Sequence, residues 1–390
     1  MRTLFRRPLM AVALLAVALT AVAGTADAQR SLPADSVVHA LIAPRADDGR
    51  NVGIVVGLID TDGSTRWMAY GRRPDNAPFD DHTLFEIGAI TGTFTATLYA
   101  DMVAKGIVRH NQPVAELLPP RTLVPGRGGR TITLWHLATH TSGLPRMPAG
   151  VVPVDPAGPY AGFDEARLLA FLSRYSLTRD IGTVFEYSKV GMGLLGHALA
   201  TRMGMRYERL LVDRVLRPLR LDETAITLTP ETRARLAEGH DTAGKAAPGA
   251  DYGALAGAGA LRSSVHDLLR YLAANITPLG SPVAAALRYA GRMHFQTDVP
   301  TRAVGLGWQR IVASSGDTLV THGGTTAGHA AFVGFDPRRR IGVVVLSNSA
   351  RAVDDIGLAL LDPAAPVVRP AVSAERHVLR NFADHRPSGR

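Results

Sequence analysis

The sequence predicts a mixed α/β fold, with a central antiparallel sheet supplied by both ends of the chain and a large helical insertion between them. Apolar, β-branched runs flank the turn signals Asp62-Gly63 and Asp336-Pro337, which is typical of hairpins. Between them, about residues 90–300 show helical apolar spacing broken by loops rich in Pro and Gly. Strands followed by helices and then strands again indicate helices gathered beside one antiparallel sheet.

The N-terminal half of this pattern contains a helix, a hairpin and a second helix. Val37, Val38, Leu41 and Ile42 recur at helical spacing, so we expect a helix over residues 34–44. Residues 52–59 and 66–70 form the arms of the first hairpin. Residues 93–104 have a helical pattern and begin the helical part.

The C-terminal elements return the chain to the sheet. A strand is expected to open at residues 305–308, and residues 330–335 and 341–346 form the second hairpin. A helix follows over residues 353–361. The predicted domain covers residues 29–362, with its sheet part at about 30–85 and 304–361 and its helical part at about 90–300. Residues 363–390 form a basic tail, with contact to anionic envelope components as an open alternative to a loosely held end.

The N-terminus has the features of a secretory signal peptide over residues 1–28. Arginines at positions 2, 6 and 7 precede an apolar run at 9–23, and Ala26-Asp27-Ala28 is a small-x-small cleavage signal. Arg6-Arg7 leaves a twin-arginine route open beside ordinary export. We therefore expect an exported protein, periplasmic or secreted, with no stable membrane anchor.

Composition limits the chemistry further. The chain has 390 residues, 46% hydrophobic and 20% charged, which excludes a disordered, collagen-like or polytopic membrane protein. It has no cysteine, so disulfides, a cysteine nucleophile and cysteine metal sites are impossible. The net charge of +9 is spread over dispersed arginines, the longest run being residues 338–340. We expect a monomer that binds no nucleic acid.

Six segments, in order along about residues 35–361, carry a resemblance to a known family. They are residues 85–94, 132–145, 185–189, 259–264, 305–308 and 322–324, and the second of them ends in His140-Thr141-Ser142-Gly143-Leu144-Pro145. Together they resemble the serine β-lactamase and penicillin-binding-protein superfamily. The nearest branch holds class C β-lactamases, D-alanyl-D-alanine carboxypeptidases, D-aminopeptidases and related esterases. The resemblance implies a β-lactamase/transpeptidase-like fold, while function depends on the site residues.

The first catalytic motif of that family is missing here. The resemblance implies Ser-x-x-Lys at a helix start, with the serine forming an acyl-enzyme and the lysine taking its proton. This chain has Ala89-Ile90-Thr91-Gly92 at that place. Neither alanine nor glycine can form the covalent intermediate or move a proton. We therefore expect no acyl-serine catalysis from Ala89 and Gly92, and we assign no catalytic residue.

The second and third motifs are changed in part. Family members have Tyr-x-Asn, where this chain has Tyr187-Ser188-Lys189. Two interpretations of Lys189 stay open: its ammonium fills part of the space left at Gly92, or it points to solvent. Ser188 is a possible substitute nucleophile, although the middle residue of this motif normally points away. The third motif, His322-Gly323-Gly324, has the His-x-Gly form, implying that His322 contacts a carboxylate or carbonyl.

The oxyanion hole of this family requires only backbone N–H groups, which Ala89 and Thr325 can supply. Ala89 also opens a helix, whose N-terminus favours negative charge. The predicted ligand-binding residues are Ala89, Tyr187, Lys189, His322, Gly324 and Thr325. We expect Ala89, Tyr187, Lys189 and His322 to meet in one cleft between the sheet and the helical part.

Two rival motifs were weighed against this interpretation. His136 and His140 have the spacing of zinc ligands on a helix, but the glutamate of His-Glu-x-x-His is absent. Gly57, Gly63 and Gly71 form no dinucleotide-binding pattern. We therefore predict no metal and no cofactor.

Three hypotheses about function follow. The first is an exported pseudoenzyme that binds a small, peptide-like or cell-wall-derived ligand. The second is an active esterase, peptidase or β-lactamase-like hydrolase that uses Tyr187, Lys189 and His322 with water or a relocated nucleophile. The third is a structural or interaction protein.

Overall fold

The computed structural model describes residues 32–368, apart from residues 72, 74–76, 149–161 and 279. Its centre is an eight-stranded antiparallel sheet in the order β2-β1-β12-β11-β10-β9-β8-β7. The strands are β1 (Gly53–Ile59), β2 (Thr65–Gly71), β7 (Phe295–Gln296), β8 (Arg302–Val304), β9 (Gln309–Val312), β10 (Thr318–Thr325), β11 (Ala330–Asp336) and β12 (Ile341–Ser347). Strand β1 from the N-terminal part pairs with β12 from the C-terminal part, which confirms the predicted sheet.

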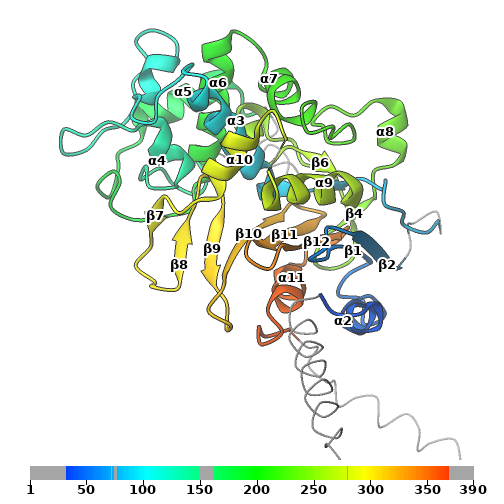
Figure 1. Cartoon of the computed structure of the whole chain (residues 1–390). Coiled ribbons are helices and arrows are strands. Elements are labelled where there is room, and N and C mark those ends of the chain that lie inside the picture. The colour runs from blue at the N-terminus through cyan, green and yellow to red at the C-terminus, as the bar shows by residue number, and fades with distance from the viewer. Residues whose placement is uncertain (1–31, 72, 74–76, 149–161, 279, 369–390) are drawn as a thin grey trace, which may run out of the picture.

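Helices lie on both faces of the sheet: the first and last helices cover one face, and the helical part lies beyond the other (Figure 1). The longer ones are α2 (Asp35–Asp47), α3 (Thr91–Ala104), α5 (Glu165–Arg174), α6 (Lys189–Met203), α9 (Val265–Ile276), α10 (Ala284–Gly291) and α11 (Asp354–Leu361). The shorter helical segments are η1 (Gly88–Ile90), η2 (Val114–Leu117), α4 (Leu134–Ala138), α7 (Tyr207–Leu211), η3 (Val212–Leu216), α8 (Pro230–Ala234) and η4 (Gly253–Ala258). The predicted first helix, central helix and last helix correspond to α2, α3 and α11.

Both faces of the central strands are buried, because each face carries its own apolar core. In β1, Ile54, Val56 and Leu58 belong to the core that includes residues of α2 and α11. The intervening Val55 belongs to the larger core, which includes residues of α9 and the helical part. Successive side chains of a strand point to opposite faces, so an unbroken apolar run is what a strand covered on both sides requires.

The sheet begins earlier in the C-terminal half than the sequence predicted. The prediction placed the start of the C-terminal sheet part at residue 304. Strand β7 lies within the predicted helical part, and β8 lies between that part and residue 304. Both strands are very short, so they have too few residues to show a period-2 pattern. The prediction that residues 305–308 open a strand was also wrong, because they form the bend between β8 and β9. Gly307 has a φ of +65° there, which interrupts extended backbone.

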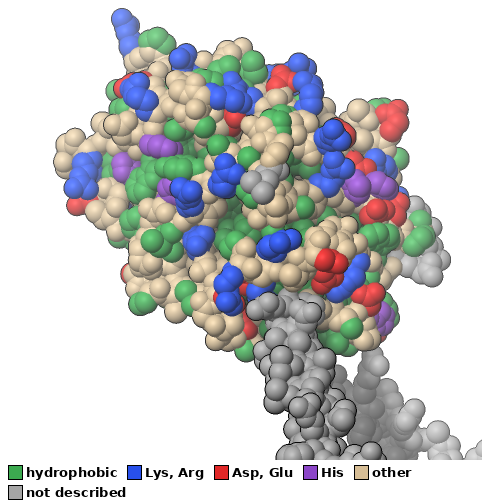
Figure 2. All heavy atoms as spheres, in the orientation of Figure 1, with side chains coloured by type: hydrophobic (Ala, Val, Ile, Leu, Met, Phe, Trp, Pro, Cys, Tyr) green, Lys and Arg blue, Asp and Glu red, His purple; other side chains and the backbone are tan. Residues whose placement is uncertain are grey.

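Several predictions concern residues outside the described part of the chain. The signal peptide at 1–28 and the tail from 369 onward belong to this group. Among the described helices, none combines the length and the apolar character that a membrane crossing needs. On the face seen in Figure 2, Lys and Arg side chains are scattered among acidic and apolar ones.

Candidate functional site

The segment that contains Ala89 and Gly92 is the junction between the small sheet and α3. Strand β3 (Phe85–Glu86) pairs with β6 (Arg262–Ser263), and the chain then turns through η1 into α3. Ala89 is buried in η1, and Gly92 lies in the first turn of α3. Neither position carries a polar side-chain atom, so Ala89 and Gly92 offer no nucleophile and no base.

The space beside Gly92 faces a methionine. A Cβ built on Gly92 would lie 3.3 Å from Cγ of Met192, and its three nearest atoms all belong to that side chain. The nearest neighbours of this position are thus Met192 atoms, and the hypothesis that the Lys189 ammonium fills part of the space stays a prediction. Met192 projects from α6 one turn after Lys189, and its flexible thioether suits an irregular gap of this kind.

Strand β10 contacts η1 through backbone atoms. A Cβ added at Gly324 would clash with the carbonyl oxygen of Ile87 and would lie 2.9 Å from the nitrogen of Ala89. A Cβ added at Gly88 would lie 2.9 Å from the nitrogen of Thr325. Glycine at position 324 is thus needed for the strand to approach this closely. The contact brings the nitrogens of Ala89 and Thr325 into one small region.

The direction of these two N–H groups follows from their positions. Thr326 donates its N–H to the carbonyl oxygen of His329 at 2.9 Å, so these two residues form a hydrogen-bonded pair at the end of the hairpin. In an antiparallel ladder the pairs alternate, and Thr325 therefore turns its N–H away from β11. Ala89 lies in the first turn of a helical segment, where N–H groups have no acceptor within the helix. Two backbone donors are therefore available where η1 meets β10.

The segment at 140–146 holds the start of α6 in place. Ser188 donates its N–H to Nδ1 of His140 at 3.1 Å and its hydroxyl to the carbonyl oxygen of Pro145 at 2.8 Å. Lys189 donates its N–H to the carbonyl oxygen of Arg146 at 3.1 Å. The Ser188 hydroxyl also caps α6 by accepting the N–H of Gly191 at 2.8 Å. Ser188 is buried and committed to these contacts, which argues against a role as substitute nucleophile.

His140 has a structural role at this junction. It accepts the N–H of Ser188 at Nδ1, so the neutral ring carries its proton on Nε2. Burial lowers the pKa of His140 to about 3, with the nearby His322 adding to the effect. The ring lies 4.5 Å from the ring of Tyr187, centroid to centroid. His140 is therefore an uncharged ring that packs against Tyr187 and accepts a hydrogen bond from Ser188. Its Nδ1 is not free to bind a metal.

His136, the other histidine of the zinc-like spacing, also has a hydrogen-bond partner. Its Nδ1 contacts the Thr133 hydroxyl at 2.8 Å, in a capping box at the start of α4. Neither His136 nor His140 takes part in a three-residue group that could hold a metal in the described chain.

Tyr187 and His322 meet across the boundary between the helical part and the sheet. Their ring centroids are 5.9 Å apart, and the guanidinium of Arg146 lies 5.1 Å from the Tyr187 centroid. His322 donates from Nδ1 to the carbonyl oxygen of Gly323 at 2.8 Å, because a carbonyl can only accept. Burial lowers the pKa of His322 to about 4, so the ring is neutral at pH 7. Its Nε2 is then an acceptor, which suits a ligand N–H or hydroxyl and not the carboxylate or carbonyl that the sequence predicted.

The backbone of β10 links this aromatic group to the two N–H donors. His322 and Gly324 are two residues apart in one strand, so they face the same side of the sheet about 6.8 Å apart. Gly324 contacts η1 on that side. His322 therefore belongs to the face of β10 on which Ala89 lies.

Lys189, the first residue of α6, is the cation of the site. Burial, with a smaller contribution from repulsion by Arg146, lowers the pKa of its ammonium to about 8. Its Nζ lies 5.8 Å from the ring centroid of Tyr252. An amine with this pKa can hold or release a proton near neutral pH. A cavity of about 740 Å³ elsewhere on the molecule, beside α7, is lined by none of these residues.

Comparison with known proteins places this arrangement in a family. Residues 38–363 match the family model described as Beta-lactamase. The chain belongs to the beta-lactamase family. It is 29% identical to a beta-lactamase of Pseudomonas fluorescens, over 80% of this chain and 92% of that protein. It is 25% identical to a beta-lactamase of Escherichia coli (strain K12), with coverage of 80% and 88%.

Family membership does not separate hydrolysis of one substrate class from another. The chain is also 28% identical to the D-alanyl-D-alanine-carboxypeptidase/endopeptidase AmpH of Escherichia coli (strain K12), over 75% of this chain and 78% of that protein. The predicted β-lactamase and penicillin-binding-protein resemblance is thereby confirmed, and so is the mixed α/β fold.

Sequence reasoning missed three members of this group. The prediction included His140 only within a motif, and it did not single out Arg146 or Tyr252. Arg146 directly follows the His-Thr-Ser-Gly-Leu-Pro segment, so its cationic side chain was a signal available in the sequence. The approach of Tyr252 to Lys189 depends on the packing of η4 against α6, which no local pattern shows.

Proposed function

We propose that this chain is an exported pseudoenzyme of the beta-lactamase family that binds a peptide-like or cell-wall-derived ligand without acyl-serine catalysis. The observation that carries the proposal is the contrast at one junction. Ala89 and Gly92 supply neither a nucleophile nor a base, while the N–H groups of Ala89 and Thr325 stay adjacent. Binding requires those donors, whereas covalent catalysis requires the missing side chains.

The polar groups around the junction complement a peptide. A ligand carbonyl oxygen would accept from the N–H groups of Ala89 and Thr325. A ligand N–H would donate to Nε2 of His322, since Nδ1 is committed to Gly323. Lys189 and Arg146 would attract an anionic group such as a terminal carboxylate. A peptide end supplies all three features within one short molecule.

The N-terminal pattern of arginines, an apolar run and a cleavage signal supports a cellular setting for this function. We infer export through residues 1–28, with the protein acting as a periplasmic or secreted monomer that binds no nucleic acid. The carboxypeptidase relative is named for peptides that end in D-alanyl-D-alanine. A peptide of that type is our first candidate ligand.

A second candidate function has one observation in its favour. The pKa of about 8 would let Lys189 act as a base on water near neutral pH. Water activated in this way would attack a carbonyl held by the two N–H donors, and no serine would be needed. This non-standard hydrolase would turn over substrate without forming an acyl-enzyme.

The deciding experiment treats the protein with a fluorescent penicillin and measures intact mass, beside turnover of a chromogenic ester and a chromogenic cephalosporin. The proposal expects no adduct and no turnover. A covalent adduct would overturn the pseudoenzyme function in favour of a relocated nucleophile. Turnover without an adduct, abolished by Lys189→Met, would instead support the water mechanism.

Ligand binding is tested by thermal stabilisation with a peptide ending in D-alanyl-D-alanine. A ligand that binds only the native state raises the melting temperature with concentration. Thr325→Pro removes one backbone donor, while Thr325→Ala keeps it and serves as the matched control. We expect stabilisation of the Ala variant and a reduced effect in the Pro variant. No stabilisation of the unmodified protein, together with no turnover, would leave the structural or interaction protein as the better hypothesis.

A further inference from the structure

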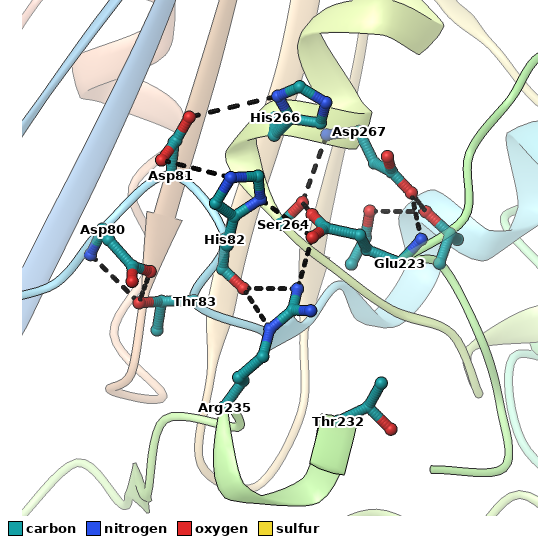
Figure 3. Close-up of polar contacts among 12 residues, drawn as sticks. Asp80, Asp81, His82, Thr83, Glu223, Thr232, Arg235, Ser264, His266 and Asp267 are labelled. Atoms are coloured by element: carbon teal, nitrogen blue, oxygen red, sulfur yellow. Dashed lines mark hydrogen bonds and ion pairs between the residues drawn. The ribbon is translucent and has the colours of Figure 1, made fainter. Parts of the chain in front are cut away.

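A second group of reactive side chains lies apart from the proposed ligand site, just before β3. Asp81 and His82 come from the segment that leads into β3, and His266 is the second residue of α9 (Figure 3). One ligand atom from each of the three lies within 4.8 Å of the others. Oδ1 of Asp81 is 3.8 Å from Nε2 of His82, and Oδ2 is 4.0 Å from Nδ1 of His266.

A carboxylate on the far side of His82 orients this group. Nδ1 of His82 lies 2.8 Å from Oε1 of Glu223, and a carboxylate accepts, so Nδ1 carries a proton there. That leaves Nε2, the atom nearest Asp81, as the ligating nitrogen. A histidine that donates its other N–H to a carboxylate is the usual arrangement behind a metal-binding imidazole.

The orienting carboxylate is itself held in place. Arg235 contacts Oε1 of Glu223 at 2.5 Å, and Ser264 donates its hydroxyl to the other carboxylate oxygen (Figure 3). Arg235 also donates twice to the main-chain oxygen of His82, at 2.8 and 3.1 Å. The N–H of His266 donates to the main-chain oxygen of Asp81 at 3.1 Å. The two ligand-bearing segments are thus already tied together by backbone and side-chain contacts.

We propose that Asp81, His82 and His266 bind one divalent transition-metal ion of the zinc type. Two imidazole nitrogens and one carboxylate oxygen are ligands that Zn²⁺ prefers, and water would complete the coordination. Bonds of about 2.0–2.1 Å space tetrahedral ligands roughly 3.4 Å apart, so the three side chains must close slightly. All three are partly exposed, with side-chain exposures of 32%, 51% and 40%, and can turn toward the ion.

A metal ion at this position would stabilise the strand pair β3–β6. Phe85, three residues after His82, pairs with Ser263, three residues before His266. This β3–β6 pair carries the chain directly into η1. A metal bridging the two segments would therefore clamp the strand pair on which Ala89 depends for its position.

The test uses the full chain without a histidine tag, stripped by a chelator and titrated with Zn²⁺ against a colorimetric indicator. We expect one bound ion that His266→Ala and Asp81→Asn each weaken by at least about tenfold. Glu223→Gln removes the orienting charge and should weaken binding by about 10-fold or more. His39→Ala is the matched control, because His39 is an exposed histidine beside Tyr70; its affinity should be unchanged.

Folding is checked separately, so that a misfolded variant does not imitate a lost site. Melting temperatures without metal identify variants that fold, and added Zn²⁺ should raise the melting temperature of the unmodified chain and of His39→Ala only. Substitution with Co²⁺ should give visible absorption bands that disappear in His266→Ala. Absence of saturable binding, or equal binding by the folded cluster variants, would overturn the proposal and leave Asp81 and His82 as an ordinary ion pair.

Discussion

The two halves of the proposed site differ in what their side chains can do. Positions 89 and 92 carry no polar side chain, and this half offers a backbone arrangement held by glycines and by contact with β10. At positions 187 and 189 polar side chains are present, with lysine where the family has asparagine, and hydrogen bonds from residues 140–146 to Ser188 and to the Lys189 N–H hold this part of the backbone. The backbone arrangement of the site depends on many contacts, so it tolerates a substitution at a single position. Covalent chemistry depends on one or two atoms and is lost with them.

The largest expected effect comes from restoring chemistry to the first half. Ala89→Ser, Gly92→Lys and Lys189→Asn together return a nucleophile and a base one helical turn apart. They also avoid two mutually repelling ammonium groups. Removing a serine nucleophile costs about a million-fold elsewhere, so we expect a partial gain of about a thousandfold in ester or cephalosporin hydrolysis.

Controls for this repair separate the two side chains. Ala89→Ser alone should stay nearly inert, because Gly92 offers no amine to take the proton. Lysine at position 92 must displace Met192, which the flexible methionine allows. A folded triple variant with no acyl adduct by mass and no turnover would show that the backbone donors are also misplaced, which would weaken the binding proposal.

Substitutions in the half around Tyr187 and Lys189 should lower the stability of the fold. His140→Ala leaves the buried N–H of Ser188 without its acceptor and opens a cavity beside Tyr187. We expect a loss of about 3 kcal/mol in the free energy of unfolding, measured with urea. The exposed His39→Ala should change it by less than about 0.5 kcal/mol. Equal stabilities of the two variants would mean that the loop does not hold α6 as described.

The close backbone approach between the halves predicts a smaller loss. Gly324→Ala places a methyl group against the carbonyl oxygen of Ile87, so η1 and β10 must separate. We expect a cost of about 2 kcal/mol, together with weaker ligand-induced stabilisation. Gly291→Ala is the matched control, since nothing lies within 4 Å of the added methyl group. A tolerated Gly324→Ala with unchanged ligand response would contradict the contact.

The smallest expected effect is the pH dependence that Lys189 confers. Burial lowers its pKa from 10.5 to about 8 in the folded chain, so folding carries the full cost of the buried charge below pH 8. Between about pH 8 and 10.5 the folded chain has released this proton and the unfolded chain has not, so stability rises with pH. We expect a rise of about 1–2 kcal/mol, because Lys189 keeps some exposure to solvent. Comparing unfolding of the unmodified chain and Lys189→Met at pH 7 and 10 should show this rise only in the former.

Local pattern was sufficient for the longer helices and strands and for the loss at positions 89 and 92, but not for the short strands β7 and β8. The hairpin around Asp62-Gly63 and the helix α3 were predictable because strand and helix periods are properties of neighbouring residues. The absence of a serine and a lysine is likewise a fact of the sequence. No packing could supply a hydroxyl to alanine or an amine to glycine.

Other features required the tertiary structure. The side chain nearest to Gly92 is Met192, and Nδ1 of His322 donates to Gly323 in its own strand, contacts that no local pattern shows. Asp81 and His82 meet His266 only because β3 pairs with β6, although nearly two hundred positions separate them in the chain. The sequence by itself determined which chemical groups the protein has and the local backbone they favour. Which groups face one another was decided by packing, because contacts between distant segments depend on the whole core and not on the neighbours of any one residue.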